Sequence, residues 1–244
     1  MIGIGIVGAK GRMGRAIAAE LEGHDAARLT AEADHGDDLA AVAGGCDVLI
    51  DFSTPAALPA VLAAAQAVGR PLVVGTTGLG EQEQAAIGAA AAAIPVLQAA
   101  NMSLGVNLLT HLVREAAARL GPDWDIEIAE MHHRHKVDAP SGTALLLGQA
   151  AANGRGVDLA ASSERGRDGI TGARTHGHIG FAALRGGSVA GDHLVILAGE
   201  GERVELGHRA ESRAIFARGA VRAAIWLNGQ RPGRYGMNDV LGLA

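Results

Sequence analysis

The sequence predicts an α/β protein with a doubly wound parallel sheet, followed by a second domain in which helices accompany a mixed sheet. Three observations support this fold class. Short apolar runs alternate with longer helical stretches over the first hundred residues, a pattern typical of parallel strands with helices on both faces. After Asn101 this alternation stops and a period-two strand pattern appears. Hydrophobic residues make up 48% of the chain and aromatic residues only 2%, so the core is expected to be aliphatic.

The first part of the chain contains five apolar runs that are short enough to be buried parallel strands. They lie at Ile2–Val7, Ala27–Ala33, 48–50, Leu72–Val74 and 96–97. The stretches between them predict helices at Arg12–Leu21, 56–68 and 81–93. Gly23, Gly69 and Pro95 mark the ends of these elements.

The second part begins with a long helix, Leu104–Leu120, that leads into the strand Asp125–His132. Ile126 and Ile128 alternate with acidic residues in this strand, so one of its faces is expected to be exposed to solvent. A second helix is predicted at 143–152 and a polar, Gly-containing loop at 162–174. The runs 178–184, 193–198 and 204–206 are interpreted as antiparallel strands.

The last helix, Ala214–Leu227, carries an apolar stripe of Ile215, Val221 and Ile225 that needs a packing partner. We therefore expect it to return to the first domain. The predicted organisation is a dinucleotide-binding domain of residues 1–103 completed by 213–244, and a mixed α/β (α+β) domain of residues 104–212 for substrate binding and oligomerisation.

Charge and cysteine content exclude several classes of partner. The net charge is −5 and no block of like charge occurs, which disfavours nucleic acid and anionic membranes. The single cysteine, Cys46, cannot form an intramolecular disulfide, as expected in a reducing compartment. The chain opens on a strand rather than on a basic leader, and its longest weakly apolar stretch, 85–100, is too mild to cross a bilayer. We expect a cytoplasmic protein.

A glycine-rich loop joins the first strand to the first helix. Its glycines, Gly8, Gly11 and Gly14, are spaced three apart, which suits a tight turn, close approach of backbone to a pyrophosphate, and close packing of helix on strand. The start of a helix also binds anions through its N–H groups and dipole. An ordinary β–α turn is the alternative. We favour dinucleotide binding by the loop residues Gly8, Ala9, Lys10, Gly11, Arg12 and Met13.

An acidic residue after the second strand is expected to bind the adenosine ribose. Asp34 lies 20 residues beyond Gly14 at the end of that strand, and Glu32 is the second candidate. The next residue, His35, is predicted to bind the cofactor together with Asp34, but it is not an Arg, so a fixed cation for a 2′-phosphate is missing there. Lys10 and Arg12 are possible substitutes. The cofactors are therefore predicted as NADH, NADPH or both, with NADH used at least as well.

The densest group of reactive side chains follows residue 129. His132, His133, Arg134, His135 and Lys136 make the end of a strand electropositive. Ser141-Gly142-Thr143 then begins a helix, whose N–H groups and hydroxyls suit a carboxylate. This arrangement predicts a site for a small anion, most simply a dicarboxylate substrate.

Three other interpretations of this cluster compete with that one. A solvated basic turn does not explain the helix start that follows it. Zinc binding by the three histidines lacks a further ligand at typical spacing, and adjacent histidines on a strand point to opposite faces; no metal is predicted. A Ser141 nucleophile lacks the Gly-x-Ser-x-Gly motif, and Ser141 is better explained as a helix cap or anion ligand.

These residues together resemble the 4-hydroxy-tetrahydrodipicolinate reductase family, formerly dihydrodipicolinate reductase. The similarity rests on the loop 8–14, on Gly75-Thr76-Thr77-Gly78, on Asn101-Met102-Ser103, on residues 132–143 and on residues 237–243. These motifs occur in order along essentially the whole chain, and the stretch 132–143 is long and specific. Two departures concern the cofactor: Asp34-His35 replaces the commoner acidic–Arg pair, and Met102 stands where an aromatic residue is frequent.

The resemblance implies a role for each matching residue. His132 and Lys136 would be the proton donors or acceptors, and His133, Gly142 and Thr143 would bind substrate with help from Ser141. Gly75, Thr76 and Thr77 would lie at the nicotinamide end of the cofactor, and the cleft would be lined by Ala99, Ala100, Asn101 and Met102. The implied reaction is NAD(P)H-dependent reduction of 4-hydroxy-tetrahydrodipicolinate to tetrahydrodipicolinate, in diaminopimelate and lysine biosynthesis. The implied assembly is a homotetramer built through the sheet of the second domain.

Two other functions share parts of this pattern. Another two-domain NAD(P)-dependent dehydrogenase, of the aspartate or homoserine type, would share the glycine loop but would not need residues 132–143. A non-catalytic dinucleotide sensor would keep the fold, and the intact His132 and Lys136 argue against it. Nicotinamide oxidation with the authentic substrate separates these possibilities.

Overall fold

A computed structural model describes residues 1–243 and divides into two compact units. The first unit consists of Met1–Leu104 and the described residues from Arg213 onward, and the second is Gly105–Ser212. The first unit has two clusters of buried hydrophobic residues, one on each face of its sheet, and the second unit has one.

The first unit is built on a six-stranded parallel sheet with the strand order β11-β5-β4-β3-β1-β2. Its strands are β1 (Ile2–Val7), β2 (Ala27–Ala33), β3 (Val48–Asp51), β4 (Leu72–Val74), β5 (Pro95–Gln98) and β11 (Gly233–Tyr235). The doubly wound sheet and the five predicted strands are confirmed. The short strand β11 was not predicted, because Gly-Arg-Tyr contains no apolar run. Since β1 lies between β2 and β3, the winding reverses beside β1, which is where such sheets bind ligands.

Helices cover both faces of this sheet. They are α1 (Arg12–Leu21), α2 (Leu39–Gly44), η1 (Pro55–Ala57), α3 (Leu58–Ala67), α4 (Glu81–Ala91), α7 (Ala214–Leu227) and α8 (Met237–Leu241). The single helix predicted at 56–68 is in fact η1 followed by α3, and each of them has a proline in its first turn. The unpredicted α2 has only six residues and is capped by the Asp38 carboxylate, which accepts from two backbone amides.

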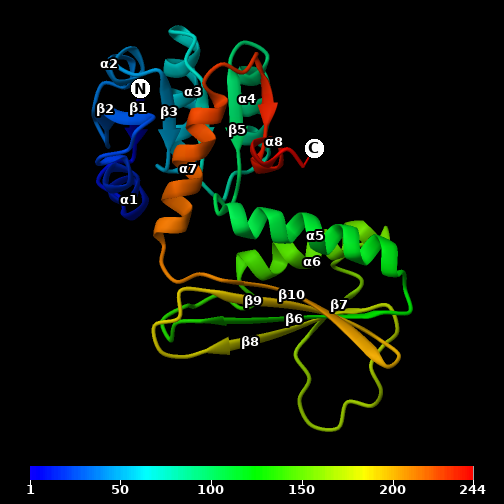
Figure 1. Cartoon of the computed structure of the whole chain (residues 1–244). Helices are drawn as coiled ribbons and strands as arrows, with labels where there is room; N and C mark the ends of the chain where they lie inside the picture. The colour runs from blue at the N-terminus through cyan, green and yellow to red at the C-terminus, as the bar shows by residue number, and fades with distance from the viewer. Residues whose placement is uncertain (244) are drawn as a thin grey trace. The chain divides into compact units, whose positions relative to one another are not determined.

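Alternating residues of the strands supply the two cores. Ile4, Ile6 and Ile50 pack with α1 and α7 on one face, whereas Leu49 and Leu72 pack with α2, α3 and α4 on the other. Figure 1 shows the helix α7, in orange, lying against a sheet whose strands come mostly from the N-terminal part of the chain. This pattern is what the doubly wound prediction requires.

The return of α7 to the first unit is confirmed, but the predicted stripe is only partly right. Val221 is buried, whereas Ile215 and Ile225 are half-buried. The buried face consists mainly of small residues, and a Cβ on Gly219 would lie 1.7 Å from the backbone oxygen of Met102. Close approach of the backbones therefore decides the orientation of this helix, rather than the largest side chains.

The second unit is built on a five-stranded mixed sheet with the order β10-β9-β6-β8-β7. Its strands are β6 (Asp125–His132), β7 (Ser163–Arg165), β8 (Ile179–Arg185), β9 (Asp192–Gly199) and β10 (Glu202–Arg209), and its helices are α5 (Leu104–Leu120), which begins at the last residue of the first unit, and α6 (Gly142–Arg155). The mixed α/β character is confirmed.

Two details of the second sheet differ from expectation. The strand β8 runs parallel to β6 rather than antiparallel, because α6 carries the chain back between them. The short strand β7 lies within the predicted loop 162–174 and pairs with β8. The rest of that polar segment is anchored by Arg167 and Arg174, which form ion pairs with Glu127 on β6 at 2.7 and 2.8 Å.

The two faces of the second sheet differ. Ile126 and Ile128 of β6 pack with α5 and α6, which lie side by side over one face (Figure 1). The residues that alternate with them, Ala129 and Met131, therefore point to the opposite face, which carries no helix of this unit.

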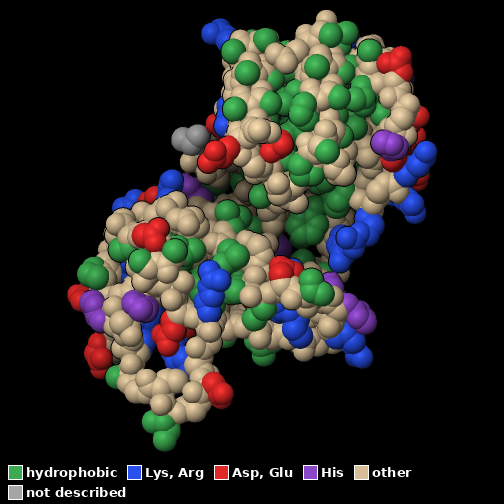
Figure 2. Space-filling model, turned by 180° about the vertical axis from the view of Figure 1, so that it is seen from behind, with side chains coloured by type: hydrophobic (Ala, Val, Ile, Leu, Met, Phe, Trp, Pro, Cys, Tyr) green, Lys and Arg blue, Asp and Glu red, His purple; other side chains and the backbone are tan. Residues whose placement is uncertain are grey.

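The surface shows no dominant charge on the side drawn in Figure 2, where acidic and basic side chains are interspersed. Over residues 1–243, none of the helices combines the length and the apolar character that a membrane crossing needs.

Candidate active site

The glycine-rich loop follows β1 and begins α1. Gly8 has a φ of +82°, and a Cβ there would lie 2.5 Å from the backbone oxygen of Phe52. A Cβ on Gly14 would lie 2.4 Å from the backbone oxygen of Gly8. Only glycine at position 14 therefore allows α1 to lie this close to the loop. The N-cap Gly11 makes no side-chain hydrogen bond, and the first turn of α1 contains no acidic residue. The helix start is thus a cradle suited to an anion.

Asp34 stands at the end of β2 beside this loop. Its carboxylate accepts hydrogen bonds from the backbone amides of His35 and Lys10, both at 2.9 Å. These two amides hold the pKa of Asp34 below its usual range. Asp34 and His35 line a cavity of about 220 Å³, whereas the second candidate, Glu32, is an exposed residue within β2 and does not line that cavity.

A second cavity of the first unit, of about 300 Å³, lies at the carboxyl ends of β3, β4 and β5. It is lined by Met13, Phe52, Gly75, Thr77, Ala100, Asn101, Met102 and Phe216. Six of these residues were predicted to bind cofactor, and Phe52 and Phe216 were not. Position 75 requires glycine for a steric reason, because a Cβ there would lie 2.3 Å from the ring of Phe52.

Two predicted residues of this region are arranged differently. The hydroxyl of Thr76 donates to the buried carboxylate of Asp51 at 2.7 Å and is not part of the cavity lining. Ala99 is half-buried and packs against the core. Asp51 has no exposed surface, and burial raises its pKa although Ser53 and Thr76 donate hydrogen bonds to it.

The cluster of the second unit is built at the junction of β6 and α6. Period-two alternation places Glu130 and His132 on the face of β6 that is covered by the helices, and both are buried. The chain then turns through Lys136 and begins α6 with the N-cap Ser141. The first turn of α6 contains no acidic residue, and the backbone of Gly142 is exposed.

Glu130 connects these parts. Its Oε2 lies 2.6 Å from Nδ1 of His132, and its Oε1 accepts the backbone amide of Ser141 at 3.1 Å. The guanidinium of Arg185, at the end of β8, donates to both oxygens at 2.8 and 2.9 Å. Burial by itself would raise the pKa of Glu130. The hydrogen bonds from Arg185 and His132 outweigh this effect and hold the pKa below its usual range.

Lys136 lies in the turn between β6 and α6. Its Nζ donates to both carboxylate oxygens of Asp138 at 2.8 and 2.9 Å. Asp138 is exposed, and the hydrogen bond from Lys136 lowers its pKa. The ammonium group of Lys136 is therefore paired with an exposed carboxylate. His133 is half-buried, and His135 is exposed.

Ser141 is engaged within the protein. Its Oγ accepts the amide of Ala144 at 3.1 Å and lies 3.0 Å from Nε2 of His193. This pair does not form a hydrolytic dyad, because Ser141 is 2% exposed and His193 is 6% exposed. Burial is also the main cause that lowers the pKa of His193 to about 4. The interpretation of Ser141 as a helix cap is confirmed, and its role in substrate binding stays a prediction.

Within residues 1–243, no cluster of three or more His, Cys, Asp or Glu side chains has an arrangement suited to a metal ion. His132 is turned toward Glu130, and its ring lies edge-on to that of His193 with the ring centroids 5.1 Å apart. The rings of His133 and His135 form a separate pair whose centroids are 6.3 Å apart. The three histidines thus fall into two groups, although only His132 belongs to β6 and the other two lie in the turn that follows it.

In this cluster of the second unit, the residues that sequence reasoning missed are Glu130, Arg185 and His193. Glu130 was within reach, because it lies two residues before His132 on the same face of a strand. Arg185 and His193 are 55 and 52 residues away from their partners Glu130 and Ser141. Only the pairing of β8 and β9 with β6 brings them together.

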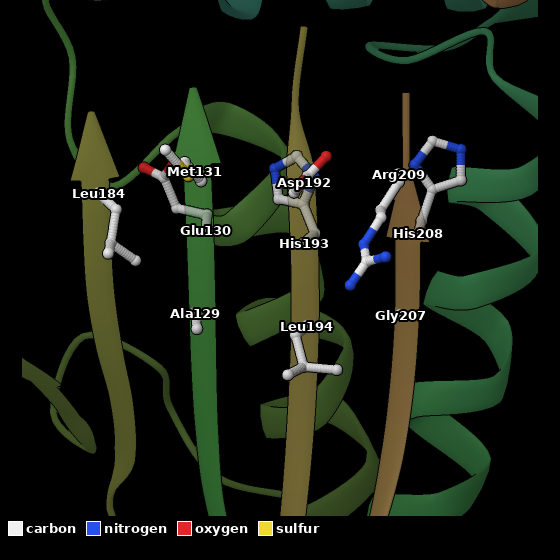
Figure 3. Close-up of a pocket in the computed structure, with 10 residues that line it drawn as sticks. All are labelled: Ala129, Glu130, Met131, Leu184, Asp192, His193, Leu194, Gly207, His208 and Arg209. Carbon is white, nitrogen blue, oxygen red and sulfur yellow. The ribbon is translucent and has the colours of Figure 1, made fainter. Parts of the chain in front are cut away.

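The helix-free face of the second sheet carries a hollow of about 370 Å³ that crosses β8, β6, β9 and β10 (Figure 3). The residues that point to this face include Ala129, Met131, Leu184 and Leu194. Leu184 is 51% exposed. Asp192 and Arg209 border the hollow.

Comparisons with known proteins agree along the chain. The family profile described as "Dihydrodipicolinate reductase, N-terminus" matches residues 2–102, and the one described as "Dihydrodipicolinate reductase, C-terminus" matches residues 105–241. The protein is 57% identical to the 4-hydroxy-tetrahydrodipicolinate reductase of Zymomonas mobilis subsp. mobilis, with 98% of this chain and 97% of the relative aligned. It is 51% identical to the enzyme of the same name from Caulobacter vibrioides, with 98% and 96% aligned.

Solved structures give the same result. The fold is similar to that of a dipicolinate-bound dihydrodipicolinate reductase from Paenisporosarcina sp. TG-14, with a TM-score of 0.83, 25% identity, and coverage of 98% of this chain and 99% of that one. A probable dehydrogenase from Thermotoga maritima has a TM-score of 0.63 at 11% identity, with 99% and 93% covered, and shows likeness of fold alone.

Proposed function

The chain belongs to the dihydrodipicolinate reductase family, and on that premise we propose which of its side chains carry out the reaction. It is an NAD(P)H-dependent oxidoreductase that reduces 4-hydroxy-tetrahydrodipicolinate to tetrahydrodipicolinate in diaminopimelate and lysine biosynthesis. The reaction takes up one hydride and one proton and releases the 4-hydroxyl group as water. The proposal assigns the dinucleotide to the first unit and the proton chemistry to the second.

The first unit fits a dinucleotide. Gly8, Gly11 and Gly14 keep the start of α1 clear of side chains, so its amides would hold the pyrophosphate, while Lys10 and Arg12 supply positive charge beside it. When bound, the dihydronicotinamide supplies the hydride. The cavity lined by Met13, Phe52, Gly75, Thr77, Ala100, Asn101, Met102 and Phe216 would hold that ring.

The Asp34 carboxylate favours NADH over NADPH. It is already fixed by two backbone amides, so it is oriented to accept hydrogen bonds from ribose hydroxyls. A 2′-phosphate beside it would bring two anions together, and His35 offers no fixed cation. We therefore expect kcat/KM for NADH to equal or exceed that for NADPH. A strong preference for NADPH would contradict this assignment.

A dicarboxylate substrate would bind at the start of α6. The exposed backbone of Gly142 and the first-turn residue Thr143 offer N–H groups to one carboxylate. Lys136 would exchange Asp138 for a substrate carboxylate, and His133 would add a second donor. Dipicolinate, the ligand of the similar solved reductase, is a planar diacid of this class.

His132 is the group that we propose as the proton donor, with Lys136 as its partner. An imidazole transfers protons efficiently near neutral pH, and an ammonium group both binds and donates. The observation that carries this assignment is the β6–α6 junction, where Glu130 contacts both His132 and the N-cap residue of α6.

We also propose a homotetramer assembled through the second sheet. The support is the helix-free face, which presents Ala129, Met131, Leu184, Leu194 and Ile196 to solvent in a single chain. An apolar sheet face of this kind is typical of a surface that another subunit covers.

The test is a coupled assay in which 4-hydroxy-tetrahydrodipicolinate is generated enzymatically and nucleotide oxidation is followed at about 340 nm with each cofactor. Reduction with either cofactor, at kcat/KM in the range of about 10⁴–10⁸ M⁻¹s⁻¹, supports the assignment. Oxidation that does not depend on the substrate would contradict it.

A further inference from the structure

We propose that Glu130, clamped by Arg185, is a positioning residue that fixes the orientation of His132 and ties it to the turn that carries Lys136. This inference rests on the proposed roles of those two side chains. Neither Glu130 nor Arg185 was assigned a role by the sequence.

The first step of the argument is the burial of Glu130. Its side chain is 1% exposed, and a buried carboxylate is costly unless it is fully paired. Both oxygens are used: Arg185 donates to each, Ser141 donates its amide to Oε1, and His132 contacts Oε2. A hydrophobic residue would fill this space at lower cost. The retained charge therefore points to a task, and the ring that it touches indicates which one.

The second step is the tautomer of His132. A carboxylate that is paired with a guanidinium is an acceptor only, so Nδ1 of His132 must carry a hydrogen and donate it to Oε2 across 2.6 Å. In the neutral ring, Nε2 is then the unprotonated nitrogen. It is consequently Nε2 that gains a proton from solvent and gives it to the substrate.

The third step is the space in front of Nε2. Gly191 lies there, and a Cβ at that position would be 3.0 Å from Nε2 of His132. Its φ of +155° also disfavours any residue with a side chain. Glycine at 191 leaves this nitrogen uncovered, while His193 packs against the ring at 5.1 Å and restrains its plane.

The fourth step is the link to Lys136. The guanidinium of Arg185 also donates to the backbone oxygen of Asp138 at 2.6 Å. Asp138 in turn holds the ammonium group of Lys136. One ion pair thus positions both proposed proton-transfer groups, although they come from the end of a strand and from a turn.

The decisive measurement is the tautomer of His132 in the full-length protein. Protein labelled with ¹⁵N-histidine is observed by long-range ¹H–¹⁵N NMR at a pH where the ring is neutral, and the His132 signals are identified as those missing in His132→Gln. We expect the hydrogen on Nδ1. A hydrogen on Nε2 would overturn the proposal, whatever the activity of the enzyme.

The kinetic arm uses Glu130→Gln, which removes the charge and keeps the size. We expect kcat to fall by about 10²-fold, while Kd for NADH and for pyridine-2,6-dicarboxylate changes by less than about threefold. Arg185→Lys keeps a charge but loses the two-pronged contact, so kcat should fall in the same direction by a smaller factor. The matched control is Glu127→Gln, which also lies on β6 and pairs with two arginines but does not contact His132.

The outcomes separate this proposal from the proposed function. A wild-type enzyme that does not reduce the substrate refutes the function, and the tautomer is still read independently. An active wild-type enzyme in which Glu130→Gln keeps kcat within about twofold refutes the positioning role alone. If Glu130→Gln does not fold, the positioning role is tested by the tautomer in the wild-type spectrum and by kcat of Arg185→Lys.

Discussion

His132 and Lys136 lie only four residues apart, but the structure holds them in different ways. His132 is buried against Glu130 through a short hydrogen bond. Lys136 is held by the exposed Asp138, a partner that is itself in contact with water. The first contact is suited to fix a ring for proton transfer, and the second is suited to open when a ligand carboxylate arrives. Substitution of each residue should therefore affect different kinetic constants.

His132→Ala should lower kcat by about 10²–10⁴-fold, because it removes a proton donor without removing a substrate contact. Lys136→Ala should lower kcat and also raise KM for the substrate, because the ammonium group would bind a carboxylate. Steady-state kinetics with both substrates varied gives these constants. His135→Ala, in the same turn but exposed, is the control. A His132→Ala enzyme within about twofold of wild type would remove this residue from the mechanism.

The buried His193 should make the protein less stable in acid. Its pKa is lowered to about 4 in the folded protein, mainly by burial, while the unfolded chain titrates near the ordinary value of about 6.5. As pH falls from about 6.5 to about 4, the unfolded state takes up the proton first, so the free energy of unfolding decreases by up to about 3 kcal/mol. Denaturant unfolding across this window measures the slope.

His193→Asn should flatten this pH dependence, since the group that titrates differently in the two states is gone. His176→Asn, an exposed histidine in the same unit, is the matched control. An unchanged slope in His193→Asn would show that other groups cause the acid sensitivity.

At the scale of the elements, packing on the sheet distinguishes glycines that look alike in sequence. Gly219 lies in α7 with its Cα against the backbone of Met102, whereas Gly88 lies in α4, where an added Cβ would meet nothing within 4 Å. Both are interior helix positions with ordinary helical backbone. Helix propensity favours alanine at each, and only the contact at Gly219 opposes it.

Gly88→Ala should therefore raise the free energy of unfolding by about 1 kcal/mol. Gly219→Ala should lower it by about 2 kcal/mol or more, because the new methyl group requires α7 to move away from Met102. Thermal and denaturant unfolding of the two variants form a matched pair. Stabilisation by Gly219→Ala would show that α7 adjusts at no cost.

The sequence predicted elements well where they carry long periodic patterns, and poorly where they do not. The five parallel strands and the period-two strand β6 were visible because burial on one or both faces sets their composition. The helix α2 and the strands β7 and β11 have six or three residues, too few for a period to appear. The direction of β8 depends on where α6 returns the chain, which no local pattern encodes.

The site shows the same division. The sequence was sufficient to predict the glycine loop, His132, Lys136 and the start of α6, because each of them belongs to one continuous segment. Arg185 was not, since an arginine that ends an amphipathic strand looks like an ordinary surface residue. Its role depends on the parallel register that sets it opposite His132. Phe52 and Phe216, which line one cavity from sites far apart in sequence, were missed for the same reason.

At the scale of the whole molecule, the helix-free face of the second sheet should determine the oligomeric state. Leu194→Asp places a charge among Ala129, Met131 and Leu184, which a subunit interface would have to bury unpaired. If the proposed tetramer is built through this face, the mass of the variant should be that of a smaller species, and light scattering after size exclusion measures both masses. Val68→Asp, at an exposed hydrophobic site in the first unit, is the control. A tetramer that survives Leu194→Asp would place the interface elsewhere.

The return of α7 to the first sheet has a consequence for biosynthesis. Once the chain has emerged from the ribosome as far as Ser212, every residue of the second unit's sheet is available to fold, but the helix that buries Ile50 and Val73 on one face of the first sheet has not yet emerged. That nascent sheet exposes an apolar face until α7 emerges, so the second unit is able to fold during translation while the nucleotide-binding unit has to wait for the last stretch of chain. Deletion of residues from Arg213 onward should consequently yield an aggregating product rather than a shorter, active one.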